Sequence, residues 1–325
     1  MGYRLNSDAT VATPRIVFTP AERTTHLFSS FIQDEITVRP DRLFVSIGTK
    51  LEHNAYTGFE LDPSARVAWT PNDRNTFWAA ISGAERTPSR SDTGIQAYLM
   101  VVPGPGDLPL VIGYAGNPDE KAEHETSVEA GYRAKLSHRF AVDATAFFNH
   151  YQHLVSVEPG TPELEPDPPH LVLLNPFANL SHGETHGVEI FTDWRVASRW
   201  TLNPGYSFLT THVHRDPGGH DLETGFTTEG TIPNHQAQVR SQVRLLSQLR
   251  WNASAYFVDR LPYLVVPSYT RLDSNLIWQA GERFPISLVG QNLLRDRHQE
   301  LGGPVATVQS DLIKRSAYVN LSWSF

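Results

Sequence analysis

The residues best suited to chemistry are histidines near the middle of the chain. His212 and His214 are two residues apart, so an extended strand places both imidazoles on one face, with Asp216 and His220 soon after. Imidazole pairs of this spacing can hold a transition-metal ion. Exposed histidines are far more often free than metal-bound, and with 14 histidines chance pairs are expected. We therefore predict no metal site and no cofactor, with His212 and His214 as weak candidate ligands.

A second group of polar residues lies at the two ends of the longest predicted loop, residues 85–124. Arg86 and Arg90 lie at its start, and Asn117 and Glu120 lie at its end. Two guanidinium groups in the mouth of a pore could bind an anionic chelate through planar, bidentate contacts. The alternative is a solvated loop whose charges only keep it in water. Arg86, Arg90, Asn117 and the more distant His220 are the candidate ligand-binding residues.

No enzyme motif accompanies these residues. The sequence has no Gly-x-Ser-x-Gly elbow, no phosphate-binding glycine loop and no His-Glu-x-x-His zinc motif. Its 27 Lys and Arg residues are outnumbered by 35 Asp and Glu, which disfavours nucleic acid as a partner. We predict a protein that is not an enzyme, has no catalytic residues and binds no nucleic acid.

The elements that position these residues have the period of β-strands. Apolar and polar residues alternate over segments of about 10 residues, the length of a tilted transmembrane strand. Examples are residues 43–52, 128–136, 142–149, 188–196 and 271–279. No apolar stretch approaches the ~20 residues of a membrane-spanning helix. The pattern predicts an all-β protein, either a membrane barrel with charges in a wet lumen or a soluble sandwich with charges in water.

The connections between the segments favour the membrane barrel. Short turns such as 136–139 and 196–199 alternate with long loops such as 85–124 and 156–184. Outer-membrane barrels have short periplasmic turns at one rim and longer external loops at the other. Several tryptophans near the short turns fit an interfacial girdle, although core packing would also explain them: Trp194, Trp200, Trp251, Trp278 and Trp323. We therefore predict an antiparallel transmembrane β-barrel.

The end of the chain shows the same alternation. Ala317, Val319, Leu321 and Trp323 fall on one face of a strand, and Phe325 ends the sequence. An aromatic end can anchor at the membrane interface. Phe325 is therefore the candidate residue for barrel assembly, and an ordinary girdle residue is the alternative.

Taken together, several motifs resemble the TonB-dependent outer-membrane receptors. They follow the order of that family over almost the whole chain: Phe31-Ile32-Gln33-Asp34-Glu35-Ile36, Arg86-Thr87-Pro88-Ser89-Arg90, Gly116-Asn117-Pro118-Asp119-Glu120-Lys121, Gly187-Val188-Glu189, Gly290-Gln291-Asn292-Leu293-Leu294 and Phe325. The resemblance implies a 22-stranded, plugged transporter barrel in the lipid of the cell outer membrane. It also implies import of a scarce nutrient, such as a ferric siderophore chelate, energised by a periplasmic TonB-type protein.

The chain departs from the family pattern at its start. We count about 13 strands plus the stub Met1–Leu5, and residues 1–10 lack the features of a secretory signal. We therefore expect residues 1–325 to form one truncated barrel domain without a plug, with TonB contacts supplied by the missing N-terminal part. The alternatives are a passive or structural outer-membrane barrel, a non-functional receptor fragment and a soluble all-β binding protein.

Overall fold

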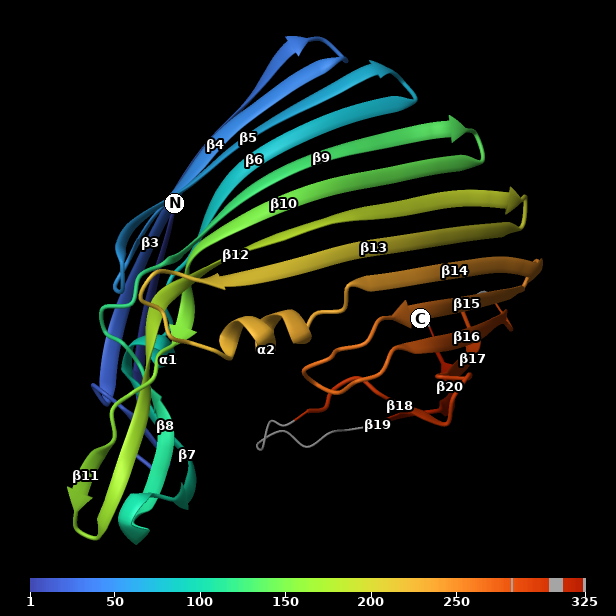
Figure 1. Cartoon of the computed structure of the whole chain (residues 1–325). Helices are drawn as coiled ribbons and strands as arrows, with labels where there is room; N and C mark the ends of the chain where they lie inside the picture. Colours follow the sequence, from blue (N-terminus) through green and yellow to red (C-terminus); the bar gives the residue numbers. More distant parts are fainter. Residues whose placement is uncertain (282, 304–311, 324–325) are drawn as a thin grey trace.

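The protein is described here by a computed structural model that covers residues 1–281, 283–303 and 312–323. Its main feature is one large antiparallel sheet (Figure 1). The long strands pair in chain order, each with the next: β3 (Glu22–Arg39), β4 (Leu43–Asn54), β5 (Gly58–Asn72), β6 (Asn75–Arg86), β9 (Glu123–Ser137), β10 (Phe140–Val157), β12 (Pro169–Ala197), β13 (Trp200–Arg215), β14 (His235–Leu246), β15 (Leu249–Val258), β16 (Tyr269–Gln279), β17 (Pro285–Gln291) and β20 (Ser316–Leu321). The short strand β1 (Gly2–Ala9) pairs with the beginning of β3. These strands confirm the predicted partial barrel and its N-terminal stub.

The two rims of the sheet differ. At the short-turn rim, β5 and β6 are joined by residues 73–74, β9 and β10 by 138–139, and β12 and β13 by 198–199. The opposite end, here called the loop rim, carries the smaller elements (Figure 1). These are β2 (Ile16–Phe18), α1 (Arg90–Gly94), β7 (Ile95–Pro103), η1 (Pro105–Asp107), β8 (Pro109–Ala115), β11 (Glu163–Pro166), α2 (Thr224–Gly230), β18 (Arg297–Gln299) and β19 (Leu312–Lys314). The predicted sorting of the connections is confirmed except between β4 and β5, where the connection predicted to be longer, 54–63, is a short turn of residues 55–57.

The long connections contain more regular structure than the sequence indicates. The predicted loop 85–124 contains the β7–β8 hairpin. Much of the predicted loop 156–184 is strand, because β12 continues above the sheet and pairs in parallel with β8, Leu171 opposite Leu110. Prolines made this segment look irregular, but an extended backbone accommodates proline wherever its missing N–H is not needed for pairing.

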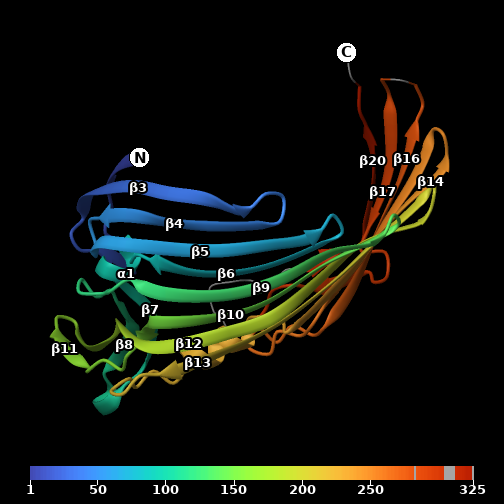
Figure 2. The same ribbon diagram turned by 90° about the horizontal axis from the view of Figure 1, so that it is seen from above.

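The sheet curls into an open trough (Figure 2). Among the described residues, few apolar side chains are buried, and half of them are alanines: Ala97, Ala122, Ala134, Val172, Leu261 and Val266. Large apolar side chains lie instead on the convex face, where Val128, Val188 and Ile190 are 47%, 40% and 42% exposed. A soluble sandwich would bury these residues between two sheets. The convex face is therefore suited to contact lipid.

The strand register sorts the residues onto the predicted faces. On β9 and β10, Val128 pairs with Phe148 on the convex face, and Arg133 pairs with Asp143 on the concave face. The convex face is not wholly free of charge, because Asp34 pairs with Ile47 there, on the edge strand β3.

One edge of the sheet is formed by β1 and the second half of β3, and the other by β20; the two edges lie apart (Figure 2). No pairing joins them within the described part of the chain. In the same residues, no helix is long and apolar enough to cross a membrane. Phe325, the predicted assembly residue, lies outside the described residues, so its role stays a prediction.

Candidate functional site

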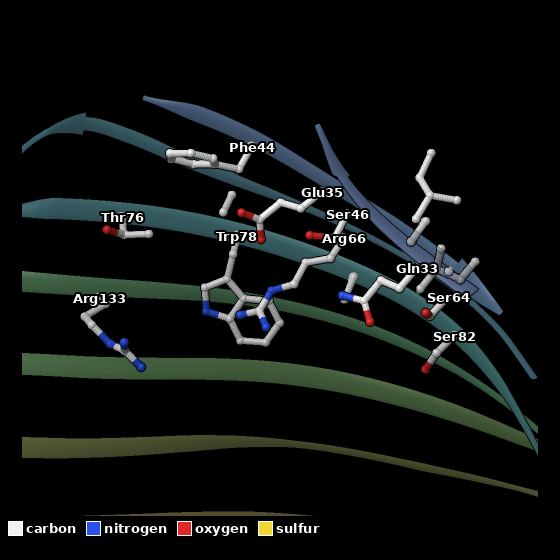
Figure 3. A pocket seen from close by; sticks show the side chains of 16 residues that line it. Gln33, Glu35, Phe44, Ser46, Ser64, Arg66, Thr76, Trp78, Ser82 and Arg133 are labelled. Carbon is white, nitrogen blue, oxygen red and sulfur yellow. The ribbon is translucent and has the colours of Figure 1, made fainter. Parts of the chain in front are cut away.

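The concave face of β3 to β6 and β9 carries a hollow of about 650 Å³ with a mixed polar and apolar lining (Figure 3). Because successive side chains of a strand point to opposite faces, most of its lining comes from every second residue. Half of the lining residues are polar or charged: Gln33, Glu35, Ser46, Ser64, Arg66, Thr76, Ser82 and Arg133. Such a surface suits water or a polar protein segment rather than lipid.

Aromatic side chains on this face lie against glycines of neighbouring strands. The Trp78 ring covers Gly131, where an added Cβ would come within 2.2 Å of the indole nitrogen. The Arg66 guanidinium stacks 4.5 Å from the centre of the Trp78 ring. Phe147 covers Gly187 in the same way. These contacts fix large side chains on an otherwise polar wall.

Helix α1 at the loop rim collects the two predicted arginines. The Arg86 guanidinium donates to Glu123 at the start of β9, and its Nη1 lies 3.3 Å from Asp92 Oδ2 in α1. Arg90 Nε lies 2.9 Å from Asp8 Oδ1, and its Nη2 donates to the carbonyl of Pro20 at 2.6 Å. Through these contacts Arg86 links α1 to β9 of the sheet, and Arg90, itself in α1, contacts the N-terminal residues Asp8 and Pro20.

Asn117 also reaches α1, because its backbone N–H donates to the Asp92 carbonyl at 2.8 Å. The structure therefore brings together three of the four predicted ligand-binding residues, Arg86, Arg90 and Asn117. Both arginines already contact carboxylates, so an anionic chelate would have to displace them. Their binding role stays a prediction.

His220, the fourth candidate, lies elsewhere on the loop rim. Its backbone N–H donates to Glu158 Oε2 at 2.6 Å, and the residue is exposed. It lines a hollow of about 440 Å³ together with Tyr114, Asn175 and Tyr263. The loop rim therefore offers a second polar recess, separate from α1.

His212 and His214 share one face of β13, as predicted. Each also lies beside a histidine of the neighbouring strand β12, which the sequence does not indicate. The His214 and His182 ring centres are 5.4 Å apart, and those of His212 and His186 are 6.3 Å apart. Within the described residues, no group of three or more His, Cys, Asp or Glu could hold a metal ion. His182 and His186 become neighbours of this pair only through the register of β12 against β13.

Sequence reasoning also missed the unusual state of Glu120. This residue is only 4% exposed, and neither carboxylate oxygen has a hydrogen-bond partner among the described residues. Burial, reinforced by the nearby charge of Asp92, raises the pKa of Glu120 to about 7. A polar loop motif gave no sign of this burial. Glu120 is thus a buried acid at the loop rim, close to α1.

An apolar convex face, a polar concave face and an elaborated loop rim together define a receptor-type β-barrel. A model of the family described as TonB dependent receptor-like, beta-barrel matches residues 1–293, so the chain belongs to this family. No curated protein sequence matches the chain.

Solved structures of siderophore receptors share the fold. PirA from Acinetobacter baumannii matches with a TM-score of 0.71 at 15% identity, and a point mutant of the ferric enterobactin receptor PfeA from Pseudomonas aeruginosa, in complex with enterobactin, matches with 0.72 at 16%. The ferric yersiniabactin uptake receptor FyuA from Yersinia pestis matches with 0.62 at 16% identity. Each match covers 94% of this chain and 46% of the other, so the chain spans less than half the length of these receptors.

Proposed function

We propose that residues 1–325 are the C-terminal part of an outer-membrane receptor that takes up a ferric siderophore or a similar chelate, with energy from a TonB-type protein. The observation that carries the proposal is the pairing of an apolar convex face with a charged, hollowed concave face on one curled sheet. This distribution fits a wall between lipid and a wet lumen. Family membership and the siderophore-receptor fold support the same function.

The open edges of the sheet bear on how such a receptor works. Unpaired N–H and C=O groups along β1, the second half of β3, and β20 cannot face lipid without large cost, so a functional barrel needs further strands to pair with them. Under the proposal, those strands and a plug that fills the trough belong to the same receptor. A plugged lumen cannot pass solute down a gradient, which is the physical reason for an energised partner.

The same open edges favour a second candidate function, a receptor fragment that transports nothing by itself.

A measurement of iron uptake distinguishes the receptor from the non-functional fragment. The longest natural reading frame that contains residues 1–325, and residues 1–325 alone, would be expressed in an iron-starved strain lacking its own receptors. Ferric catecholate, hydroxamate and citrate chelates would be supplied with radioactive iron.

We expect the longer protein to import one of these chelates and residues 1–325 alone to import none. Deleting TonB should abolish the uptake. Uptake that persists without TonB would contradict active transport and favour a passive barrel. No uptake by either protein would favour the non-functional fragment.

A further inference from the structure

Three arginines meet at the short-turn rim, where β13, β14 and β15 lie side by side (Figure 1). Arg199 lies in the turn before β13, and its carbonyl accepts from the Arg244 N–H at 2.8 Å. Arg244 in turn pairs directly with Arg250 across the β14–β15 hairpin. We call these three residues the arginine cluster.

The arginine cluster lines a hollow of about 370 Å³. The next row of its wall is formed by Thr201, Gln242 and Asn252, which pair with one another across the three strands. Thr201 is six residues from Ser207, which pairs with the concave-face residue Glu189, so this row lies on the concave face. The lining supplies guanidinium, hydroxyl and amide groups and contains no aspartate or glutamate. The hollow is therefore rich in hydrogen-bond donors and positively charged.

The charges of the arginine cluster are not neutralised within the described part of the chain. None of the three guanidinium groups forms an ion pair or a hydrogen bond with a described residue. Another concave-face arginine, Arg133, does have such a partner, because its Nε donates to Asp143 Oδ2 at 2.7 Å. Like charges directly opposite each other in a hairpin are destabilising. The two arginines that face each other across the β14–β15 hairpin are thus stabilised by an anion that contacts both.

The chemistry and size of the hollow select the kind of anion. Guanidinium groups bind carboxylate and phosphate groups through planar, bidentate contacts, and three of them around one hollow favour a ligand with several anionic groups. A volume of about 370 Å³ falls in the range of small-molecule sites, roughly 300–1,000 Å³. Lipid headgroups do not fit, because the concave face points away from lipid under the proposed function.

We infer that the arginine cluster is an exit site, at which an anionic ferric chelate binds after it has crossed the lumen and before it is released. The inference rests on the proposed function, which places the loop rim outside the cell and the short-turn rim in the periplasm. All three arginines are exposed, and exposed ionic contacts are individually weak. A weak site at the outlet holds the chelate without trapping it. The inference also narrows the substrate class to chelates with a net negative charge.

The test uses the full-length protein in neutral detergent, with a fluorescent dye on a single cysteine introduced by Ser247→Cys in the β14–β15 turn. Every other cysteine is changed to serine. Ferric iron quenches a dye that is close to it, so the signal reports a chelate in this hollow and not at the loop rim. The probe is ferric citrate. A neutral ferric trihydroxamate is a separate arm, and inorganic phosphate and a tetraglutamate peptide are competitors.

The test variant replaces all three arginines of the cluster: Arg199→Gln, Arg244→Gln and Arg250→Gln. The matched control removes the same charge from exposed arginines of other strands at the short-turn rim: Arg39→Gln, Arg42→Gln and Arg74→Gln. Each exposed ionic contact contributes roughly 2- to 5-fold, so the test variant should bind ferric citrate at least about tenfold more weakly than the unchanged protein. The control should bind like the unchanged protein, and the neutral chelate should not quench the dye.

An unchanged affinity of the test variant for ferric citrate, or an equal loss in the control, would overturn the inference. Equal quenching by the neutral chelate would overturn it too, because the site would then not select charge. Tighter binding of inorganic phosphate or of the peptide would assign the cluster to a different anion. A protein that binds ferric citrate as expected but imports no chelate into cells would instead contradict the proposed function itself.

Discussion

Replacing Val188 with arginine should cost about 2–4 kcal/mol of folding free energy, whereas arginine at the adjacent Glu189 should cost less than about 1 kcal/mol. Val188 lies on the convex face between Ala146 and Phe208, so an arginine there would be pushed into lipid. Glu189 lies on the concave face, where its carboxylate accepts from Ser207 Oγ at 3.3 Å and water can solvate a new charge. The same substitution should therefore be much more costly at Val188 than at its neighbour Glu189.

The measurement is denaturant-induced unfolding of the full-length protein in lipid vesicles, followed by tryptophan fluorescence. Val188→Leu serves as the control for the change of shape without charge, and it should unfold like the unchanged protein. Similar losses for Val188→Arg and Glu189→Arg would mean that the convex face does not lie in lipid.

Raising the pH from about 5 to 8.5 should loosen the loop that contains Glu120, and Glu120→Gln should remove this pH dependence. The folded-state pKa of Glu120 is raised from the ordinary 4.5 to about 7, because burial and Asp92 disfavour its charge. The folded loop therefore holds the proton more tightly than the unfolded loop does. The resulting stabilisation is complete below about pH 4.5 and is lost as the pH rises through 7, a change on the order of 1–3 kcal/mol.

Hydrogen exchange of the amides in α1 and residues 116–122, corrected for the intrinsic effect of pH, measures this change. Asp119→Asn is the matched control, because it removes the neighbouring but exposed carboxylate. Protection that is independent of pH in the unchanged protein, or that responds equally to both substitutions, would show that Glu120 is not the titrating group.

Much of the sheet could be predicted from the sequence because apolar and polar residues alternate with a period of two, which is also the period with which side chains point to the two faces of a strand. The segments around Val128, Val142 and Val188 are strands with the predicted faces. The loop-rim strands could not be found in this way. The first residues of β12 pair with β8 and β11 above the main sheet, their exposure does not alternate from residue to residue, and their prolines are typical of a loop.

The arrangement of the candidate sites depended on contacts that lie far apart in sequence. The sequence shows Arg86 as a charged residue, but its carboxylate partners, Asp92 in α1 and Glu123 in β9, are brought to it only by the folded chain. The pair His212 and His214 was read along one strand, whereas the structure completes it with His182 and His186 from the next. Glu120 carried no sequence signal, because burial of a loop residue is set by the elements that close over it.

The most direct test of the account is the accessibility of single cysteines along β10. Residues 1–325 contain no cysteine, so each of residues 142–149 can be replaced by cysteine in a full-length protein whose cysteines outside this range have been changed to serine. After assembly into outer membranes, a water-soluble thiol reagent should label cysteines at Asp143, Thr145 and Asn149 and should leave those at Val142, Ala144 and Ala146 unlabelled. Uniform labelling, or alternation of the opposite parity, would contradict a receptor barrel whose convex face lies in lipid.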